Sequence, residues 1–534
     1  ATSDLLRSYG MADIPETEDL GSGDDPHFPR LARAAADLYG RALVSCESLC
    51  WPKQSFQITP AQWLARVNLL FASGVNAIVM HGFPYALHRD AWPGWYPFAP
   101  SPFLPGFSSM INEANPLWAA IGGLNDYIAR TQAVLQGSRN VVPVAVYFGE
   151  IGHFHGIEPK ATDELVQRLL DHGYDYDRIN DDCILHGRVA GGALRTAGGA
   201  SYSALVLPAR AVLRAATAAR LAELAGAGLR IFFVDRPPSR DEGYLAPADN
   251  DRRVREAVQA ALTNGARIAA AAALPAALAQ GGVGPNLTFI GAPCVFIEKT
   301  LNGRTAYLLH NQQTRTATVA FTTRAAGHPQ LWNAFDGSRV GLRSTRRGGQ
   351  TEVSLEIPAG GAALVVFAAR PLTPAPALTA VDAIELGRRG WTLAVTGHGA
   401  KGRTVRQDLT LERLRDWAEL GLADVSGQGA YEVEVTVPAG WLAGGHRVWL
   451  ELGVTHDMAT VAVNGATVAT LIAAPFEVAI GGALRAGSNR LTITVANSPN
   501  NAMIDPKAAG LKDLTPQPAG LLGPVRLVLK RSAA

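Results

Sequence analysis

The chain has 534 residues, of which 48% are hydrophobic and 18% are charged, a composition that excludes a largely disordered protein. A chain of this length is expected to form several domains. Its formal net charge of +2 is too small for strong electrostatic binding to nucleic acid. No uninterrupted apolar stretch reaches the roughly 18–20 residues that a membrane-spanning helix needs, so we expect no membrane partner.

The four cysteines are too few for a disulfide framework in a chain of this length. Cys46 and Cys50 flank Glu47, but no second cysteine pair or nearby histidine completes a zinc set. We therefore expect buried thiols that behave as small hydrophobic groups, and no metal site at this position. The first residues show no charged-then-apolar export signal, which leaves open a removed signal, a start further upstream, or no export.

Residues 1–138 alternate between predicted strands and helices. An apolar strand over 41–47 ends in Glu47, and a second strand over 75–82 ends near His81. Continuous apolar strands that alternate with helices predict a parallel β/α architecture. Two such units are too few to close an eight-stranded barrel, so this region is interpreted as the C-terminal part of a (β/α) barrel.

Two helices are predicted in the same region. The first begins at Thr59, a natural N-cap, with Pro60 at its first position, and ends at Gly74. The second begins at Asn115 and ends near Gly137. Between the second strand and this helix lies a long loop, residues 83–114.

The rest of the chain divides into three further predicted domains. Residues 139–285 repeat buried strands and helices, which predicts a second α/β domain, and a plain doubly wound domain without chemistry is an open interpretation. Residues 286–372 change to alternating strands with turn signals, which indicates a β-sandwich. After a proline-rich linker, residues 373–534 predict a second, jelly-roll-like β-sandwich. The fold class is therefore multidomain α/β plus all-β.

The candidate site lies where the first two strands end, because active residues of β/α barrels are found at carboxyl strand ends. Glu47 and His81 meet this condition. The loop that follows His81 is rich in aromatic residues, among them Tyr85, Trp92 and Trp95, whose rings offer apolar faces to sugar C–H groups. Two alternatives remain: a lid that plugs its own barrel, and a Glu47 that is only a salt-bridge partner.

Glycoside hydrolysis needs two carboxylates across the scissile bond. Besides Glu47, the loops of this region contain Asp90, Glu113 and Glu150, and none of the three is well placed for the second role. Glu150 with the two histidines that follow it does not match the helical metalloprotease spacing, so a surface loop is expected there.

Several segments resemble the second half of the family 106 α-L-rhamnosidases. They are "YGRALVSCESLCW" (39–51), "TPAQWLARVNLLFASGVNAIVMHGFPY" (59–85), "WPGWYPF" (92–98) and "FSSMINEANPLWAAIGGLNDYIARTQAVLQ" (107–136). Further along, 426–435, 453–480 and 518–527 resemble the galactose-binding-like sandwich of large glycosidases, and "PQLWNAFDGS" (329–338) resembles their shorter sandwich. Residues 139–285 resemble a glutamine-amidotransferase-like domain that lacks a Cys-His-Glu triad, so we expect a structural role.

The resemblance implies an activity, a mechanism and roles for individual residues. The family removes terminal α-L-rhamnose from plant glycosides or pectic glycans with inversion, uses two acidic residues and is associated with calcium. Glu47 matches the later catalytic glutamate, interpreted as the general base. His81, Tyr85, Trp92 and Trp95 fall at positions of the substrate pocket.

The chain departs from the family in one respect that affects the mechanism. The segment that carries the family's other acid lies well upstream and has no counterpart here, nor do the first barrel strands. An N-terminal half of the same enzyme is therefore an expected partner, and the calcium ligands are expected outside this chain. Rhamnosylated small molecules or plant polysaccharides are the expected substrates, in the periplasm or outside the cell, although a cytoplasmic location is not excluded by the sequence.

Two other functions stay open. The chain is alternatively a non-catalytic carbohydrate-binding fragment whose sandwiches hold glycan, or part of a glycosidase for another deoxy-sugar or a uronide. Binding that survives removal of Glu47 would indicate the first, and a substrate panel separates the second.

Overall fold

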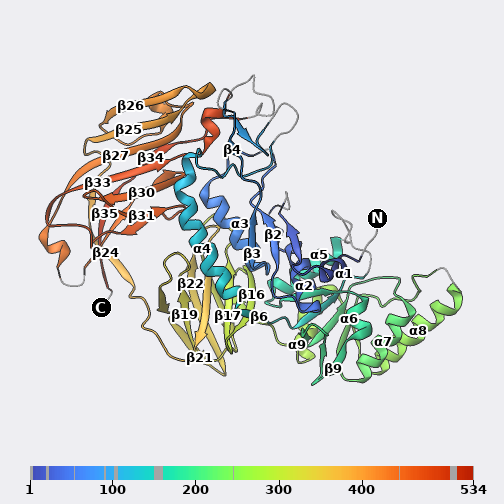
Figure 1. The fold of residues 1–534 in the computed structure, drawn as a ribbon. Coiled ribbons are helices and arrows are strands. Elements are labelled where there is room, and N and C mark those ends of the chain that lie inside the picture. The colour runs from blue at the N-terminus through green and yellow to red at the C-terminus, as the bar shows by residue number, and fades with distance from the viewer. Residues whose placement is uncertain are drawn as a thin grey trace.

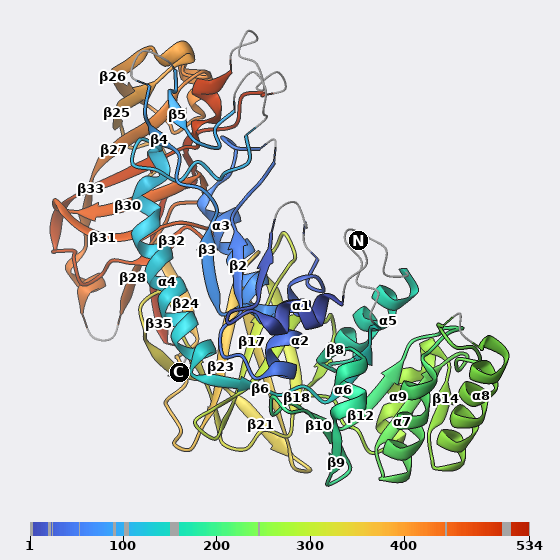
Figure 2. The same cartoon turned by 45° about the vertical axis from the view of Figure 1, so that its right-hand side comes forward.

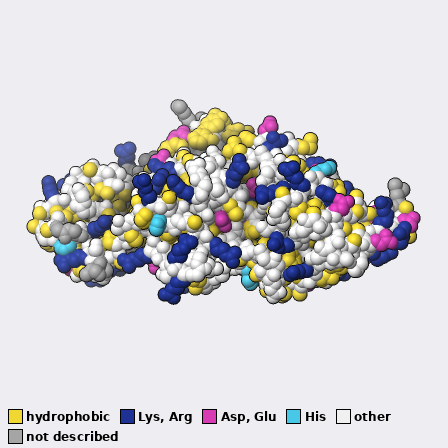
Figure 3. Space-filling model, turned by 90° about the horizontal axis from the view of Figure 1, so that it is seen from below, with side chains coloured by type: hydrophobic (Ala, Val, Ile, Leu, Met, Phe, Trp, Pro, Cys, Tyr) yellow, Lys and Arg dark blue, Asp and Glu magenta, His cyan; other side chains and the backbone are white. Residues whose placement is uncertain are grey.

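The computed structural model describes residues 4–19, 23, 25–52, 54–88, 92–100, 106–149, 160–243, 246–443, 446–504 and 514–532. The molecule is elongated, with the α/β region at one end and the C-terminal sandwich at the other (Figure 1). The first β-sandwich and a small parallel sheet lie between these ends in both ribbon views (Figure 2). On the face shown in Figure 3, Lys and Arg side chains are scattered and form no single continuous patch, in keeping with the small net charge.

The N-terminal region contains a three-stranded parallel sheet in the order β1-β2-β3. Its strands are β1 (Glu16–Glu18), β2 (Ser45–Ser48) and β3 (Ala77–Met80). The parallel β/α architecture is thus present with one more strand than predicted. Its helices are α1 (Leu5–Met11), α2 (Pro29–Tyr39), α3 (Pro60–Ala72) and, after the 3-10 turn η1 (Pro116–Trp118), α4 (Ala119–Gln136). The loop between β3 and η1 carries the short strands β4 (Tyr85–Ala86) and β5 (Trp95–Tyr96).

Helix α3 begins as the sequence predicts. Thr59 accepts a hydrogen bond from the backbone N–H of Gln62, and the Gln62 side chain accepts one from the backbone of Thr59, which forms a capping box. The helix is buried on two sides. Leu64 and Val67 pack with strands of the first sandwich, and Leu70 packs with Cys46 under the parallel sheet.

The second α/β region is doubly wound around an all-parallel sheet in the order β14-β13-β12-β7-β8. The strands are β7 (Val144–Tyr147), β8 (Tyr176–Ile179), β12 (Ala204–Leu207), β13 (Arg230–Val234) and β14 (Arg267–Ala269), with helices α5 (Lys160–Asp171), α6 (Asp181–His186), α7 (Ala215–Gly226), α8 (Pro247–Thr263) and α9 (Leu274–Gln280). A hairpin sheet of β9 (Arg188–Ala190), β10 (Ala193–Arg195) and β11 (Ser201–Tyr202) is attached to it.

The first β-sandwich has a four-stranded and a six-stranded sheet. The smaller sheet has the order β15 (Thr288–Ile290), β18 (Ala317–Thr323), β22 (Gln350–Ile357), β21 (Ser344–Arg347), and the larger one β20 (Arg339–Gly341), β19 (His328–Trp332), β23 (Ala362–Ala368), β17 (Arg304–His310), β16 (Val295–Leu301), β6 (Ser138–Asn140). β22 alternates exposed and buried residues along its whole length, the period that its sequence predicts. β6 lies across the predicted boundary at 138/139 and pairs with β16, so the N-terminal region contributes a strand to this sandwich.

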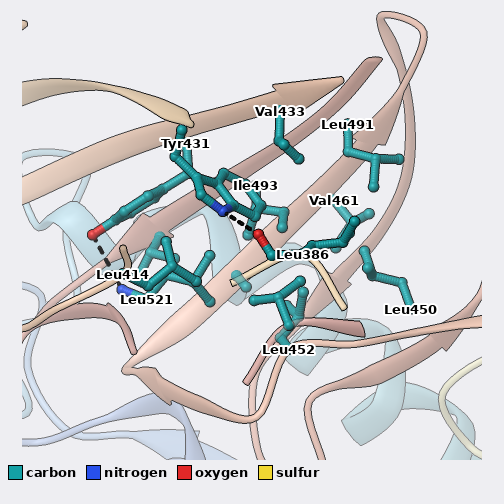
Figure 4. Packing of buried hydrophobic residues seen from close by; sticks show 14 of the residues in the cluster. Leu386, Leu414, Tyr431, Val433, Leu450, Leu452, Val461, Leu491, Ile493 and Leu521 are labelled. Atoms are coloured by element: carbon teal, nitrogen blue, oxygen red, sulfur yellow. Dashed lines mark hydrogen bonds between the residues drawn. The ribbon is translucent and has the colours of Figure 1, made fainter. Parts of the chain in front are cut away.

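The C-terminal sandwich also has a four-stranded and a six-stranded sheet. The four-stranded sheet has the order β24 (Leu378–Glu385), β35 (Arg526–Ser532), β28 (Arg447–Glu451), β32 (Glu477–Ala479). The six-stranded sheet has the order β26 (Thr404–Leu411), β25 (Trp391–His398), β27 (Ser426–Val437), β33 (Gly487–Ala496), β30 (Met458–Val463), β31 (Ala466–Leu471). A separate two-stranded sheet pairs β29 (Val454–His456) with β34 (Gly520–Gly523). Figure 4 shows side chains of both sheets meeting in its core, where the Tyr431 hydroxyl accepts a hydrogen bond from the backbone N–H of Leu521.

Candidate active site

The candidate site is built on the carboxyl ends of the small parallel sheet. In the register, Glu47 lies beside Glu18 of β1 and Val79 of β3. Because successive side chains of a strand point to opposite faces, Cys46 faces the packed core under helices α2 and α3, and Glu47 faces the other side. On that side Val79 is 46% exposed and Ser45 is buried, so the described part of the chain leaves this face of the sheet uncovered at its carboxyl end.

Glu47 and His81 lie together, as their positions at neighbouring strand ends predict. The Nδ1 atom of His81 is 2.5 Å from Oε1 of Glu47. The Glu47 side chain is 32% exposed and that of His81 is 10% exposed. The carboxylate is therefore open to solvent on one side and held by an imidazole on the other.

Two phenylalanines of the aromatic loop fix the His81 ring. The ring lies 4.7 Å from that of Phe98 and is stacked on that of Phe107 at 5.4 Å between centroids. Gly82 adopts φ +70°, and a Cβ there would lie 2.5 Å from the Phe98 ring, so glycine allows this close approach. The Cys50 thiol donates a hydrogen bond to the backbone oxygen of Phe107, which ties the loop to the end of β2.

The surroundings of His81 indicate its tautomer. Its Nε2 atom is buried and has no hydrogen-bond partner among the described residues. A proton on Nε2 would be a buried donor without an acceptor, which is unfavourable. The proton therefore belongs on Nδ1, where it is donated to the Glu47 carboxylate.

A further carboxylate at the sheet edge, Asp19, is not predicted from the sequence. It follows β1, its backbone N–H donates to the backbone oxygen of Glu47 at 2.8 Å, and its own carboxylate pairs with Arg66 at 2.8 Å. Its side chain is only 2% exposed, so its contacts are those of a structural anchor. The polar sequence around β1 carries no apolar strand pattern that would have indicated a strand end here.

The other aromatic residues proposed from the sequence lie further along the loop. Tyr85 is exposed on β4, opposite Tyr96 of β5. Trp92 lies against His398 at 4.9 Å and donates its indole N–H to the backbone oxygen of Ala502 at 3.2 Å, so it contacts the C-terminal sandwich. Trp95 packs against Phe56 in a small cluster that includes Met503.

Of the other carboxylates considered from the sequence, Glu113 alone lies within the described residues. Asp90 and Glu150 lie outside the described residues, and Glu113 is exposed just before η1. Cys46 and Cys50 are free and buried, as expected, and burial raises the pKa of both thiols. Within the described ranges, no group of three His, Cys, Asp or Glu side chains is arranged to hold a metal ion. No helix there is long and apolar enough to cross a membrane.

Comparison with known proteins places this chain, with its part of a β/α sheet followed by β-sandwiches, in a family of glycoside hydrolases. The family described as alpha-L-rhamnosidase, glycoside hydrolase family 106, matches residues 18–343. Since the match spans more than half of the chain, the chain belongs to glycoside hydrolase family 106.

Solved structures and curated relatives extend this comparison. A rhamnosidase from Novosphingobium sp. PP1Y is 26% identical with a TM-score of 0.79, over 98% of this chain but only 52% of that protein. The chain thus spans about half the length of that rhamnosidase. A Formosa agariphila protein named "Putative beta-glucuronidase" is 26% identical over 216 residues, 39% of this chain and 17% of that protein. A beta-galactosidase from Bacillus circulans is 10% identical over 68% of this chain and 62% of that protein, with a TM-score of 0.43.

Proposed function

We propose that this chain supplies the general base of an inverting glycosidase that removes terminal α-L-rhamnose from glycosides or pectic glycans. The observation that carries the proposal is the hydrogen bond between His81 Nδ1 and Glu47 Oε1 at the open end of the parallel sheet. This hydrogen bond holds the Glu47 carboxylate in one orientation at the solvent-exposed end of the sheet. An ionised carboxylate can take a proton from water, whereas the catalytic acid must hold its proton.

In this mechanism the Glu47 carboxylate removes a proton from a water molecule that attacks the anomeric carbon of the rhamnosyl group. The partner acid protonates the leaving oxygen from the opposite face, which requires a separation of roughly 6.5–9.5 Å between the two carboxyl groups. His81 orients Glu47, and the ring stack of Phe98 and Phe107 fixes His81. A single orientation of the base favours the reactive geometry.

The partner acid is proposed to come from polypeptide that completes the barrel. The carboxyl end of one face of the described β1-β2-β3 sheet, with Glu18, Glu47 and Val79, is uncovered, and a closed barrel needs about eight strands. This chain matches 52% of the Novosphingobium rhamnosidase, which supports further polypeptide of the same enzyme as the source. An N-terminal half is proposed for it from the family resemblance.

The substrate would approach along the aromatic loop. Tyr85 is exposed there and Trp92 is 37% exposed, so both retain ring surface for a sugar or an aglycone. Trp95 is assigned to supporting the loop, because its ring packs against Phe56. We propose a periplasmic or extracellular location for the enzyme, because plant glycosides and polysaccharides reach a bacterial cell from outside.

Calcium remains a proposal from the family resemblance alone. The described residues contain no carboxylate cluster that fits the six to eight oxygen ligands that calcium takes. No step of the mechanism is therefore assigned to it.

The test compares Glu47→Gln with Glu113→Gln in the enzyme that contains both the barrel-completing half and this chain. Glu113 is an exposed carboxylate at the end of the same loop region and is the matched control. We expect Glu47→Gln to lower kcat for an aryl α-L-rhamnoside by about 10³-fold or more, since base catalysis alone contributes on the order of 10²–10⁴. Activity of Glu47→Gln within a few-fold of the control would contradict the proposal.

A second function is suggested by the relative named as a glucuronidase. An enzyme for uronides would hydrolyse an aryl glucuronide faster than an aryl α-L-rhamnoside. Measuring kcat/KM on both substrates with one preparation separates the rhamnosidase from the glucuronidase function. Loss of both activities in Glu47→Gln would support the role of Glu47 as the base for either substrate.

A further inference from the structure

A large cavity lies at the opposite end of the parallel sheet from Glu47. Its volume is about 1140 Å³, and it is lined by Val44 and Asn76, which precede β2 and β3, together with residues of α2, β6, β16 and the α/β region. Ligand pockets typically have about 300–1,000 Å³, so this cavity has room for more than one sugar ring. The proposed catalytic reaction does not use it.

Three polar side chains from separate segments meet in this cavity. Lys299 of β16 and Asn140 of β6 are directly opposite each other in the antiparallel register. The Asn140 side-chain amide donates to both carboxylate oxygens of Asp37 on α2, at 2.9 and 3.1 Å. An ammonium, an amide and a carboxylate therefore line one part of the cavity wall.

Asp37 is the carboxylate that most stabilises the charge of the Lys299 ammonium, although the two side chains make no direct ion pair. Lys299 is 4% exposed, and its ammonium makes no hydrogen bond or ion pair with any residue of the described ranges. Burying an ammonium without a hydrogen-bond partner is unfavourable for its charged form. Burial indeed lowers the pKa of Lys299 and raises that of Asp37.

The surrounding charges indicate what kind of ligand fits. Asp175 and Asp177 are paired with the buried guanidinium groups of Arg30 and Arg33. Lys299 and Asp37 then remain as one cation and one anion without an ion pair between them. The lining as a whole carries the cations Arg41, Arg139, Lys299 and Arg324 and the carboxylates Asp37, Asp177 and Glu298. Cations and carboxylates are thus present in nearly equal number, so the wall around Lys299 and Asp37 suits a neutral ligand.

We propose that this cavity is a second carbohydrate-binding site, which takes a neutral sugar through Asp37, Asn140 and Lys299. A sugar hydroxyl both donates and accepts, so it can accept a hydrogen bond from the Lys299 ammonium and donate one to the Asp37 carboxylate. Bound there, a glycan would be held at the end of the sheet remote from the candidate base. The choice of a rhamnosyl ligand as the probe rests on the proposed function.

The experiment titrates the full chain with methyl α-L-rhamnopyranosyl-(1→2)-α-L-rhamnopyranoside and follows binding by isothermal titration calorimetry. We expect Lys299→Met and Asp37→Asn each to weaken binding by about tenfold or more, because a hydrogen bond to a charged group contributes that much. Arg324→Ala, which removes an exposed cation from the same cavity, is the matched control and should leave the affinity unchanged. Because the titration reads binding and not hydrolysis, its outcome does not depend on whether Glu47 is the catalytic base, which separates this proposal from the proposed function.

A second measurement uses the unaltered protein, so it does not depend on a variant that folds. The chain has seven lysines, and acetylation of each can be followed by peptide mass spectrometry. Saturating disaccharide should slow acetylation of Lys299 several-fold and leave that of the exposed Lys401 unchanged.

Unchanged affinity in both cavity variants, or no protection of Lys299, would overturn the proposal. Binding of a galacturonate disaccharide in place of the neutral one, with loss in Arg324→Ala, would overturn the assignment to a neutral ligand.

Discussion

The Glu47–His81 contact depends on the stack that surrounds the imidazole. We predict that His81→Phe, which keeps an aromatic ring between Phe98 and Phe107 but removes the Nδ1 donor, lowers kcat about 10–100-fold with little change in KM. His81→Gln, whose amide can donate to Glu47, should recover part of the loss. Steady-state kinetics on an aryl α-L-rhamnoside checks this, and equal activity of His81→Phe and the native enzyme would show that the donor is irrelevant.

A second histidine gives a prediction about pH. His27 is buried between the Tyr176 hydroxyl, 2.7 Å from Nδ1, and Gln167, 3.0 Å from Nε2, and burial lowers its pKa from 6.5 to about 3. Below pH 6.5 the unfolded chain binds a proton on His27, whereas the folded chain does not until the pH approaches 3. The contribution of the neutral His27 to the free energy of unfolding is therefore complete above pH 6.5 and decreases as the pH falls towards 3.

The prediction is tested against His27→Gln, which cannot titrate. On lowering the pH from about 7.5 to about 5, the native protein should lose about 2 kcal/mol more unfolding free energy than the variant does. Urea denaturation at the two pH values measures this difference. Parallel pH dependence of the two proteins would contradict the assignment.

At the residue scale, the sequence was sufficient for some of the site and insufficient for the rest. Glu47 and His81 could be predicted because both end apolar strands, and parallel strands bring their carboxyl ends together. The choice of Phe98 and Phe107, among many loop aromatics, as the rings that meet His81 depends on how a long loop folds back. Local pattern does not determine that, and the same holds for Trp92, whose contacts are with the C-terminal sandwich.

At the scale of elements, helix α2 joins the N-terminal region to the α/β region. Arg33, fully buried, pairs at 2.8 Å with Asp175, which precedes β8, and at 2.7 Å with Asp177 of β8. Removing one partner of a buried ion pair leaves an uncompensated charge, so Arg33→Met should lower the unfolding free energy by about 3–5 kcal/mol.

The control for this prediction is Arg252→Met on α8. Arg252 is an exposed arginine whose pairs with Asp249 and Glu256 lie on the helix surface, and exposed pairs contribute little. Denaturation curves for the two variants should therefore differ clearly. Similar curves would mean that the buried pairs contribute no more than surface ones.

Elements with strong local signals could be predicted, and those without them could not. The start of α3 follows from Thr59 and Pro60, whose cap chemistry is local. β1 has the sequence Glu-Thr-Glu and becomes a strand only by pairing with β2. β6 is likewise short and polar, and its membership of the first sandwich comes from pairing with β16, more than 150 residues later in the chain.

At the scale of the whole molecule, the N-terminal region is bound into its neighbours on several sides. Arg30 donates to the backbone oxygen of Phe296 in the first sandwich and pairs with Asp175 of the α/β region. Helices α3 and α4 pack on strands of the first sandwich, and α4 also shares a core with Met458 and Ile472 of the second. This support holds the β1-β2-β3 sheet in place while one of its faces remains available for the proposed barrel-completing half.

The central claim is that Glu47 is the base of an inverting reaction, and the product formed by a variant without it tests this most directly. Glu47→Ala in the complete enzyme, given sodium azide and an aryl α-L-rhamnoside with a good leaving group, should regain activity, because azide needs no base to attack the anomeric carbon. Proton NMR of the product should show β-L-rhamnosyl azide. Formation of the α-azide, or unimpaired hydrolysis by the variant without azide, would contradict the account.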